Sequence, residues 1–384
     1  MPSAKPHGGA RTTVRVALVA LVVLVAIGFV LSRISADAYE ISPGGANPVA
    51  PIISIDGHTA PKSNGQILLT DVYLTSLNWL TWIGAKLDSN SQVVPAAALV
   101  DPGVSISELD AQGYLEMAQA KDSARVAALT RLGYHVGHTP TGAIVEAVGT
   151  NTPASGVLHV ADVIVGAQGQ AIATSCGLIS ALHDQAPGSK IKLMVKPAKI
   201  SDSGEITYGS PEERSLTVGT PPKGDNAAES GCPGVTTPSS GFLGVSVQTD
   251  VAYTYPFTIT ISTPNIGGPS AGLAMTLGII DQLSSGHLVH HSVIAATGTM
   301  APDGAVGDVG GVPQKAIAVS RAGASLFLVP SVELGPARST ASSSLHVAAV
   351  NDLNQAISIL FDHGGTLTMA NGTVEGKPHT VAKS

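Results

Sequence analysis

The longest apolar segment of the 384-residue chain lies near its N-terminus, where Val16 to Leu31 are all apolar residues or glycine. A helix rises about 1.5 Å per residue, so this run spans roughly 24 Å, and the wider segment from Thr12 to Ser32 spans roughly 31 Å. The second value matches the hydrocarbon core of a bilayer, which is roughly 30 Å thick. No second run of this kind occurs. We therefore expect one transmembrane helix at most.

Positive charges flank this segment unequally. Only Arg33 follows it closely, whereas three basic residues precede it: Lys5, Arg11 and Arg15. Because basic residues are retained in the cytoplasm, we expect a single-pass cell-membrane protein, with residues 1–38 as cytoplasmic tip and anchor and the bulk of the chain extracytoplasmic. The alternative is a cleaved signal peptide, since Ala36 to Ala38 has the pattern of a cleavage site. We favour the anchor because the apolar run is long for a signal core.

Strand-like and helix-like patterns after the anchor predict an α+β architecture. In residues 39–132, a mixed N-terminal module, we expect strands at Ile52 to Ile55 and Gln66 to Leu74, which alternate and are rich in β-branched residues. Ser105 to Leu132 has the helical repeat, and Gly133 ends it. This module presents no catalytic constellation.

Residues 133–220 predict a separate small domain. Its expected elements are the strand Ala143 to Val148, a second strand ending at Ile164, the helix Cys176 to Gln185 and the strand Lys190 to Lys196. The Pro-Ala-x-Gly turn at Pro153 to Gly156, the strand Ala161 to Ile164 and the short helix before a basic strand resemble a bacterial PDZ domain. The resemblance implies that protein or peptide substrates are captured, through C-termini or extended segments, as an added strand beside that helix.

Residues 221–240 are rich in Pro, Gly, Ser and Thr and predict a linker or long surface loop. Regular patterns resume in residues 241–362. The expected elements there are the strands Val245 to Val247, Phe257 to Ile261, Val293 to Thr297 and Ser325 to Val329, and the helices Ala271 to Leu283 and Leu353 to Phe361, the last with Asp352 as N-cap. Residues 363–384 are Gly-, Thr- and Lys-rich, and we expect a disordered tail.

Composition narrows the functional classes. The chain is 44% hydrophobic and 12% charged, so it can bury sizeable cores. A net charge of -7 without a long basic run makes nucleic acid an unexpected partner. Cys176 and Cys232 lack metal-ligand spacing, and both a disulfide and buried free thiols stay open. His287, His290 and His291 lack the usual acidic or cysteine partners, so we expect a solvated loop there, no metal site and no cofactor.

Two glycine-rich helix starts carry the candidate chemistry. The first runs from Pro264 to Gly272, with Gly268 and Pro269 immediately before Ser270. A serine at a strand-to-helix junction lies near free backbone N–H groups that can hold an oxyanion, and glycine lets a substrate backbone approach. The second runs from Asp303 to Lys315 and enters a helix with a proline in its first turn.

Lys315 lies on the apolar face of that second helix. Its neighbours at helical spacing are Val312 and Val319, while Gln314 and Arg321 lie on a more polar stripe. Burial and the positive helix start both disfavour the ammonium form and lower the pKa of the lysine. An ordinary lysine, with a pKa of about 10.4, is neutral only about once in a thousand molecules near pH 7.4. The placement therefore predicts a lysine suited to act as a general base.

The motifs resemble the proteolytic domain of Lon-type Ser-Lys proteases. They are Gly-Pro-Ser-Ala-Gly at 268 to 272, Thr-Gly at 297 to 298, and Asp-Gly-x-Val-Gly-x-Val-Gly-Gly-x-x-x-Lys at 303 to 315. The whole order of segments resembles the PDZ-containing, membrane-anchored Lon-like proteases of Gram-positive bacteria. This resemblance implies that Ser270 is the nucleophile, Lys315 the base and Thr297 a residue that orients the lysine, with Gly268 and Pro269 supporting the site.

The chain departs from the family pattern in two respects. ATP-dependent Lon enzymes often carry an acidic residue three positions before the serine, where this chain has Gly267. No Gly-x4-Gly-Lys-Ser/Thr phosphate loop occurs in the sequence. We therefore predict an ATP-independent serine endopeptidase acting on extracytoplasmic proteins. Its oligomeric state stays open.

Three other interpretations are compatible with parts of this pattern. Gly-x-Ser-x-Gly also matches the nucleophile elbow of α/β-hydrolases, which requires a later acid and a histidine such as His346 or His363, but that leaves the lysine segment unexplained. A structural interpretation makes Ser270 a helix N-cap and Lys315 a surface residue. The third is a membrane-anchored PDZ scaffold with an inactive protease domain, which turnover of an unfolded substrate would distinguish.

Overall fold

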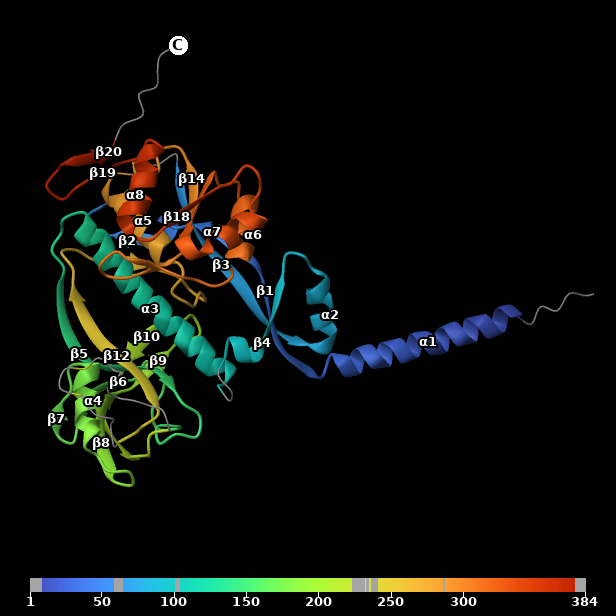
Figure 1. Ribbon diagram of the computed structural model, residues 1–384, viewed down its shortest axis with the longest axis horizontal. Coiled ribbons are helices and arrows are strands. Elements are labelled where there is room, and N and C mark those ends of the chain that lie inside the picture. Colours follow the sequence, from blue (N-terminus) through green and yellow to red (C-terminus); the bar gives the residue numbers. More distant parts are fainter. Residues whose placement is uncertain are drawn as a thin grey trace, which may run out of the picture. The chain divides into compact units, whose positions relative to one another are not determined.

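The computed structural model describes residues 9–58, 65–100, 104–222, 232, 235, 241–285 and 287–376 (Figure 1). The chain divides into two compact units: residues 1–44 with 72–101, and residues 45–71 with 102–384. The predicted linker, residues 221–240, lies outside the described residues except at 221, 222, 232 and 235.

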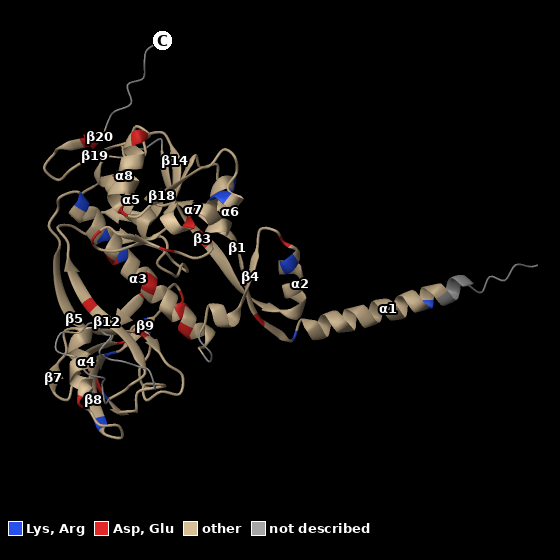
Figure 2. Cartoon of the chain, viewed as in Figure 1, with Lys and Arg blue, Asp and Glu red and all other residues tan. Residues whose placement is uncertain are grey.

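The first unit contains the apolar helix that the sequence predicts. Helix α1 (Gly9–Leu31) is long enough to cross a bilayer over Thr13–Leu31, and none of that stretch is buried within the protein. From Thr13 to Leu31, Arg15 is the only charged residue of α1 (Figure 2). Both an anchor and a signal sequence have these properties.

A small folded part accompanies α1 in the first unit. Strand β1 (Ser35–Pro48) pairs with β4 (Gln92–Pro95), and strand β3 (Gln66–Asn78) leads into helix α2 (Trp79–Leu87). The Asn78 side chain caps α2 by accepting a hydrogen bond from the third helical N–H. The core of this part consists of Ala38, Leu77 and Ala85.

A parallel sheet with two buried faces organises the second unit. Its strands follow the order β18 (His346–Val350), β17 (Leu326–Pro330), β14 (Val293–Ala296) and β3, with β1 beyond β3. Neighbouring residues of each strand enter different cores, as the period of two requires. Leu68, Ala295 and Phe327 pack on one face, and Ile67, Ile294 and Leu328 on the other.

Helices cover both faces of this sheet. The face with Ile67 packs against α3 (Ile106–Arg131), α5 (Gly272–Leu283) and α8 (Leu353–Asp362), and the other packs against α6 (Val312–Arg321) and α7 (Leu334–Thr340). Helix α5 is apolar on nearly all sides, and it is buried from Gly272 to Gln282. The predicted Asp352 N-cap of α8 is confirmed, since its side chain accepts from Gln355 N (2.8 Å).

An antiparallel sheet forms the middle domain. Its order is β11 (Glu212–Thr217), β8 (Lys190–Lys196), β6 (Val163–Ala167), β5 (Gly137–Val148) and β12 (Val245–Thr254), with helix α4 (Ser175–His183) packed beside it. Buried Asp162 fixes one corner, because its carboxylate bonds Arg214 (2.6 Å) and the Ala198 N–H (2.9 Å). Strand β12, expected from the sequence within the C-terminal region, completes this sheet.

Short antiparallel pairs complete the second unit. They are β13 (Ile259–Ile261) with β2 (Ile53–Ile55), β15 (Thr299–Met300) with β16 (Val306–Gly307), β9 (Ala198–Ile200) with β10 (Ile206–Tyr208), and β7 (Gln170–Ala171) with β6.

The expectation of a disordered tail at 363–384 is wrong over its first half. Strands β19 (Thr366–Thr368) and β20 (Val374–Gly376) form a hairpin. Leu367 enters the main core, and Glu375 pairs with Arg131 at 2.5 Å, so tertiary contacts order a segment whose composition indicates none. Residues 377–384 lie outside the described part.

Candidate active site

Ser270 lies in the turn that leads from β13 into α5, as the sequence predicts. Gly268 has a φ of 86°, which favours glycine, and its N–H donates to the Gly113 carbonyl of α3 (2.7 Å). The Pro269 carbonyl accepts from the first N–H of α5 (3.2 Å), and the Ser270 carbonyl accepts from Gly298 N (3.0 Å). Three hydrogen bonds, with α3, with α5 and with the segment after β14, therefore hold the backbone of this turn. Ser270 itself is half-buried.

Lys315 lies in the first turns of α6, which begins after Gly311 in the left-handed conformation (φ 68°). Its side chain is 2% exposed and lies between Val312 and Val319, which are also buried. Its predicted placement on a buried face is confirmed. The expectation of a polar stripe at Gln314 is wrong, because Gln314 is buried too.

Thr297 connects the two halves of the site. It follows β14 at the carboxyl edge of the parallel sheet, where α/β proteins commonly bind ligands, and it is fully buried. Its Oγ1 accepts a hydrogen bond from Lys315 Nζ (3.2 Å) and donates one to the Ser270 carbonyl oxygen (3.2 Å). The structure thus brings Ser270, Thr297 and Lys315 together from three separate segments.

The surroundings of Lys315 destabilise its ammonium form. Burial lowers the pKa of Lys315 from 10.5 to about 8, and the carboxylates of Asp71 and Glu333 partly oppose that effect. With a pKa of about 8, about one lysine in five is neutral at pH 7.4. Lys315 is therefore able to accept a proton near neutral pH.

These two acidic residues have no counterpart in the motifs. Asp71 follows the part of β3 that pairs with β14, so it lies at the same sheet edge as Thr297. Glu333 lies in the turn after β17. The sequence signal for Asp71 is the polar pair with Thr70 that interrupts the apolar run of β3, and Glu333 has no such signal.

The backbone N–H groups around Ser270 are the candidate donors for an oxyanion. Those of Gly268, Gly272 and Leu273 already donate to carbonyl groups, at 2.7, 3.2 and 3.1 Å. Those of Ser270 and Ala271 have no acceptor among the residues that the structure describes. Of the backbone N–H groups at the start of α5, only those of Ser270 and Ala271 are therefore available in the described residues to bind an oxyanion.

The Ser270 hydroxyl and Lys315 are not hydrogen-bonded to each other in the described part of the chain. Such contacts often form only with substrate bound. The histidines of the hydrolase alternative lie elsewhere: exposed His346 begins β18 at the amino edge of the sheet, and His363 Nδ1 donates to the Ile359 carbonyl (2.8 Å). Over the described ranges, no three His, Cys, Asp or Glu side chains converge as a metal site.

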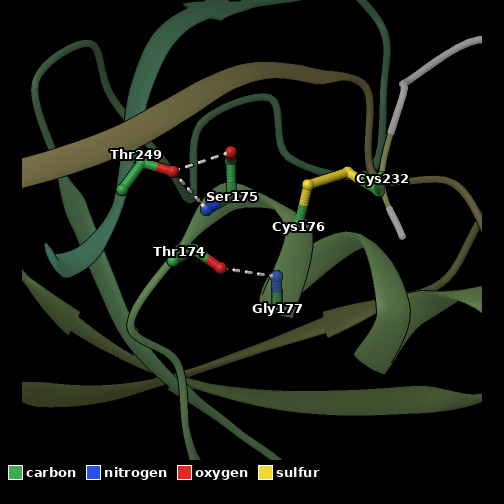
Figure 3. The surroundings of a disulfide bond; sticks show 6 residues. All are labelled: Thr174, Ser175, Cys176, Gly177, Cys232 and Thr249. Atoms are coloured by element: carbon green, nitrogen blue, oxygen red, sulfur yellow. Dashed lines mark hydrogen bonds between the residues drawn. A yellow bond between two sulfur atoms is a disulfide. The ribbon is translucent and has the colours of Figure 1, made fainter. Parts of the chain in front are cut away.

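Strand β12 covers the edge of β5 in the middle domain. All 10 of its residues pair antiparallel with β5. Ser175, at the start of α4, donates its N–H to Thr249 Oγ1 of β12 (3.1 Å; Figure 3). Val245 and Val247 pack on the core of this domain, yet no residue of β12 is fully buried. A segment of the chain itself therefore lies beside α4, where the sequence predicts an added peptide strand.

Cys176 and Cys232 form a disulfide, which resolves the two possibilities that the sequence leaves open (Figure 3). Cys176 lies in the first turn of α4, next to the contact between Ser175 and Thr249. Cys232 belongs to the segment that leads to β12. The bond therefore tethers the approach to β12 to the helix that β12 contacts.

Two protein-family models match the chain. Residues 103–199 match the PDZ domain, and residues 257–362 match the Lon protease (S16) C-terminal proteolytic domain. The first match contains α3, α4 and the strands from β5 to β8, and the second contains Ser270, Thr297 and Lys315. The chain thus combines an apolar N-terminal helix, a PDZ domain and a Lon-type proteolytic domain in one α+β protein. No curated protein matches it.

Solved structures with similarity to this chain include several bacterial PDZ domains. The PDZ domain of an SdrC-like protein from Listeria monocytogenes is 20% identical, covers 28% of this chain and 87% of its own, and has a TM-score of 0.20. The PDZ domain of an SdrC-like protein from Listeria innocua is 22% identical, and the match covers 28% of this chain and 92% of the Listeria innocua domain, with a TM-score of 0.20. A protein from Geobacillus thermodenitrificans is 26% identical, and the match covers 22% of this chain and 85% of that protein, with a TM-score of 0.17.

Proposed function

We propose that this protein is an ATP-independent serine endopeptidase in which Ser270 is the nucleophile and Lys315 the general base. The observation that carries the proposal is the buried Lys315 ammonium, bonded to Thr297, whose hydroxyl in turn bonds the Ser270 backbone. Lys315 has no ion-pair partner among the described residues, and a buried charge without one destabilises a fold, so its link through Thr297 to the Ser270 backbone favours a chemical role. The absence of a phosphate loop from the sequence supports independence from ATP.

In the first half of the reaction, neutral Lys315 Nζ accepts the proton of Ser270 Oγ as the oxygen attacks the substrate carbonyl carbon. Thr297 limits the positions that Nζ can take, because its Oγ1 holds the amine from the buried side. The carbonyl oxygen gains negative charge, and the N–H groups of Ser270 and Ala271 are the available donors for it. Lys315 then gives its proton to the leaving amine, which leaves an acyl-enzyme and a neutral lysine.

In the second half, Lys315 takes a proton from a water molecule that attacks the acyl carbon. Collapse of the second tetrahedral intermediate breaks the ester bond, and the proton on Lys315 returns to Ser270 Oγ. The enzyme regains its starting state, and no nucleotide or metal takes part in any step.

This proposal places the proteolytic domain outside the cytoplasm, with α1 as the anchor. The basic residues before α1 support that orientation. The disulfide between Cys176 and Cys232 supports it independently, because disulfides persist in oxidising compartments. Substrates would then be extracytoplasmic proteins.

The PDZ domain captures substrate segments in this proposal, and β12 gates that capture. A peptide that adds to β5 beside α4 takes the place of β12. Strands β5, β6 and β8 each bury several side chains, whereas β12 buries none fully, so releasing β12 costs less than releasing an inner strand. In sequence, β12 is followed by β13 and then by the turn that holds Ser270. Release of β12 would therefore also change the position of that turn.

The gating proposal is tested by binding, in Ser270→Ala protein so that cleavage does not interfere. The probe is a fluorescent peptide that copies residues 243–254. We expect Val247→Asp, which weakens the hold of β12 on the core, to bind the probe about tenfold more tightly, since tenfold corresponds to about 1.4 kcal/mol. Ala252→Asp, at an exposed position of the same strand opposite the uncharged Thr139, is the matched control and should not change affinity. Equal affinities for both folded variants would show that β12 is a permanent strand.

The catalytic proposal is tested with the purified full chain and fluorescent casein, without nucleotide. Wild type should release fluorescence, and Ser270→Ala should not. A strict requirement for ATP would refute the nucleotide-independent form. A folded wild-type protein that cleaves no unfolded substrate would favour the PDZ scaffold with an inactive protease domain.

A further inference from the structure

Helix α2 turns its apolar face to solvent. Trp79, Leu80, Ile83 and Leu87 are 42%, 45%, 47% and 83% exposed. At 100° per residue these four side chains share one stripe about 100° wide, whereas the buried Ala85 lies well outside it. In a helix that packs on a protein core, such a stripe faces inward. Here it has no cover among the described residues of the first unit.

This stripe begins close to the end of α1. The Trp79 N–H donates to the Ile34 carbonyl (3.1 Å), and Ile34 is only three residues beyond Leu31, the last residue of α1. Three residues span about 10 Å at most and the hydrogen bond adds a few ångströms, so the start of α2 lies within about 15 Å of the end of the apolar helix. Ile34 itself is exposed, as are Tyr73 and Leu74 in the same unit.

The chemistry of α2 matches the boundary between lipid head groups and acyl chains. Tryptophan has a large apolar ring with one polar N–H and concentrates at that boundary. Lys86 places its Nζ 5.7 Å from the centre of the Trp82 ring, at the flank of the stripe, where a long stem reaches toward head groups. We propose that α2 is an interfacial helix whose apolar face lies in the surface of the bilayer that α1 crosses. The inference extends the proposed anchoring and does not depend on catalysis.

The chain supplies its own probe for this inference, because Trp79 and Trp82 are its only tryptophans. The full chain is reconstituted into phosphatidylcholine vesicles, with or without lipids brominated near the head group. We expect bromine to quench the tryptophan emission and the spectrum to lie to the blue of its value in urea. Vesicle flotation reports anchoring by α1 separately. A chain that floats with vesicles but shows unquenched, water-like emission overturns the inference.

A matched pair of substitutions separates lipid contact from folding. Leu87→Asp changes the most exposed residue of the stripe, so it should leave the fold intact and reduce quenching by about half or more, because a charge disfavours immersion of the helix. Val374→Asp changes another exposed apolar residue, on β20, and should leave quenching unchanged. Equal quenching in both variants would contradict the interfacial placement.

Discussion

Helices α6 and α2 depart from the usual distribution of side chains in opposite directions. Helix α6 buries the charged Lys315, whereas α2 exposes the apolar Trp79, Ile83 and Leu87. Each arrangement is unfavourable for an isolated domain in water. In α6 the burial gives a lysine with a lowered pKa, bonded to Thr297. In α2 the exposure gives a face suited to lipid. The direction of the departure therefore agrees with the function proposed for each helix: chemistry for α6 and contact with lipid for α2.

The largest effect should follow from changing the reactive pair. We expect Ser270→Ala and Lys315→Ala each to lower kcat/KM on casein by about a thousandfold or more, and the double variant to be no worse than either, because residues that act as one unit are not additive. Circular dichroism checks folding. If the losses of the two single variants multiply in the double variant, Ser270 and Lys315 do not act in one step, and burial of Lys315 in α6 would not be explained by catalysis.

A smaller loss should follow from removing the group that positions the lysine. Thr297→Val deletes the hydroxyl that bonds Lys315 and the Ser270 carbonyl. We expect kcat to fall about 10- to 100-fold, the range for losing a hydrogen bond to a charged group, with little change in KM. Thr297→Ser restores a hydroxyl and should recover most of the activity. If Ser and Val behave alike, Thr297 has only a packing role.

Much of the placement of Ser270 and Lys315 was predictable, because it depends on local patterns. The glycine-rich helix start placed Ser270 at a junction, and the neighbours Val312 and Val319 placed Lys315 on a buried face. Gly113 and Asp71 could not be found that way. Gly113 acts through its backbone carbonyl, and Asp71 reaches the site only because β3 and β14 are neighbours in the sheet, more than 200 residues apart in sequence.

The missed elements have equally physical reasons. Trp79–Leu87 directly continues a strand, so its short apolar pattern does not separate helix from strand. The β19–β20 hairpin depends on the distant Arg131 and on burial of Leu367, which its composition does not indicate. The pairing of β12 with β5 crosses the predicted linker, and no local pattern specifies such a partner.

The two helices should also differ in how substitution changes stability. Lys315→Met should raise the free energy of unfolding by about 1–3 kcal/mol at pH 7, because it removes a buried charge. Since the folded-state pKa of about 8 lies below 10.5, the wild-type penalty is full below pH 8 and fades as the pH rises to 10.5. The difference in the free energy of unfolding between Lys315→Met and wild type, measured with urea, should therefore shrink between pH 8 and pH 10.5. A difference in stability that does not change with pH would mean that the charge of Lys315 is not its cause.

The smallest expected effect is that of α2 on catalysis. Leu87→Asp should leave casein turnover in detergent within about twofold of wild type, and its stability within about 0.5 kcal/mol, because Leu87 is 83% exposed. A large loss of turnover would show that α2 supports the proteolytic site and would end the contrast drawn between the two helices.

The most direct test of the central claim is the pH dependence of kcat/KM for wild type and Lys315→Arg. Arginine keeps the charge and nearly the length of lysine, but it does not deprotonate in proteins. With Lys315 as the base, wild-type activity rises with pH and levels off above an apparent pKa near 8, and folded Lys315→Arg is inactive at every pH. A folded Lys315→Arg protein with near-wild-type turnover, or a wild-type profile governed by a pKa near 6.5, would contradict the account and point to a histidine instead.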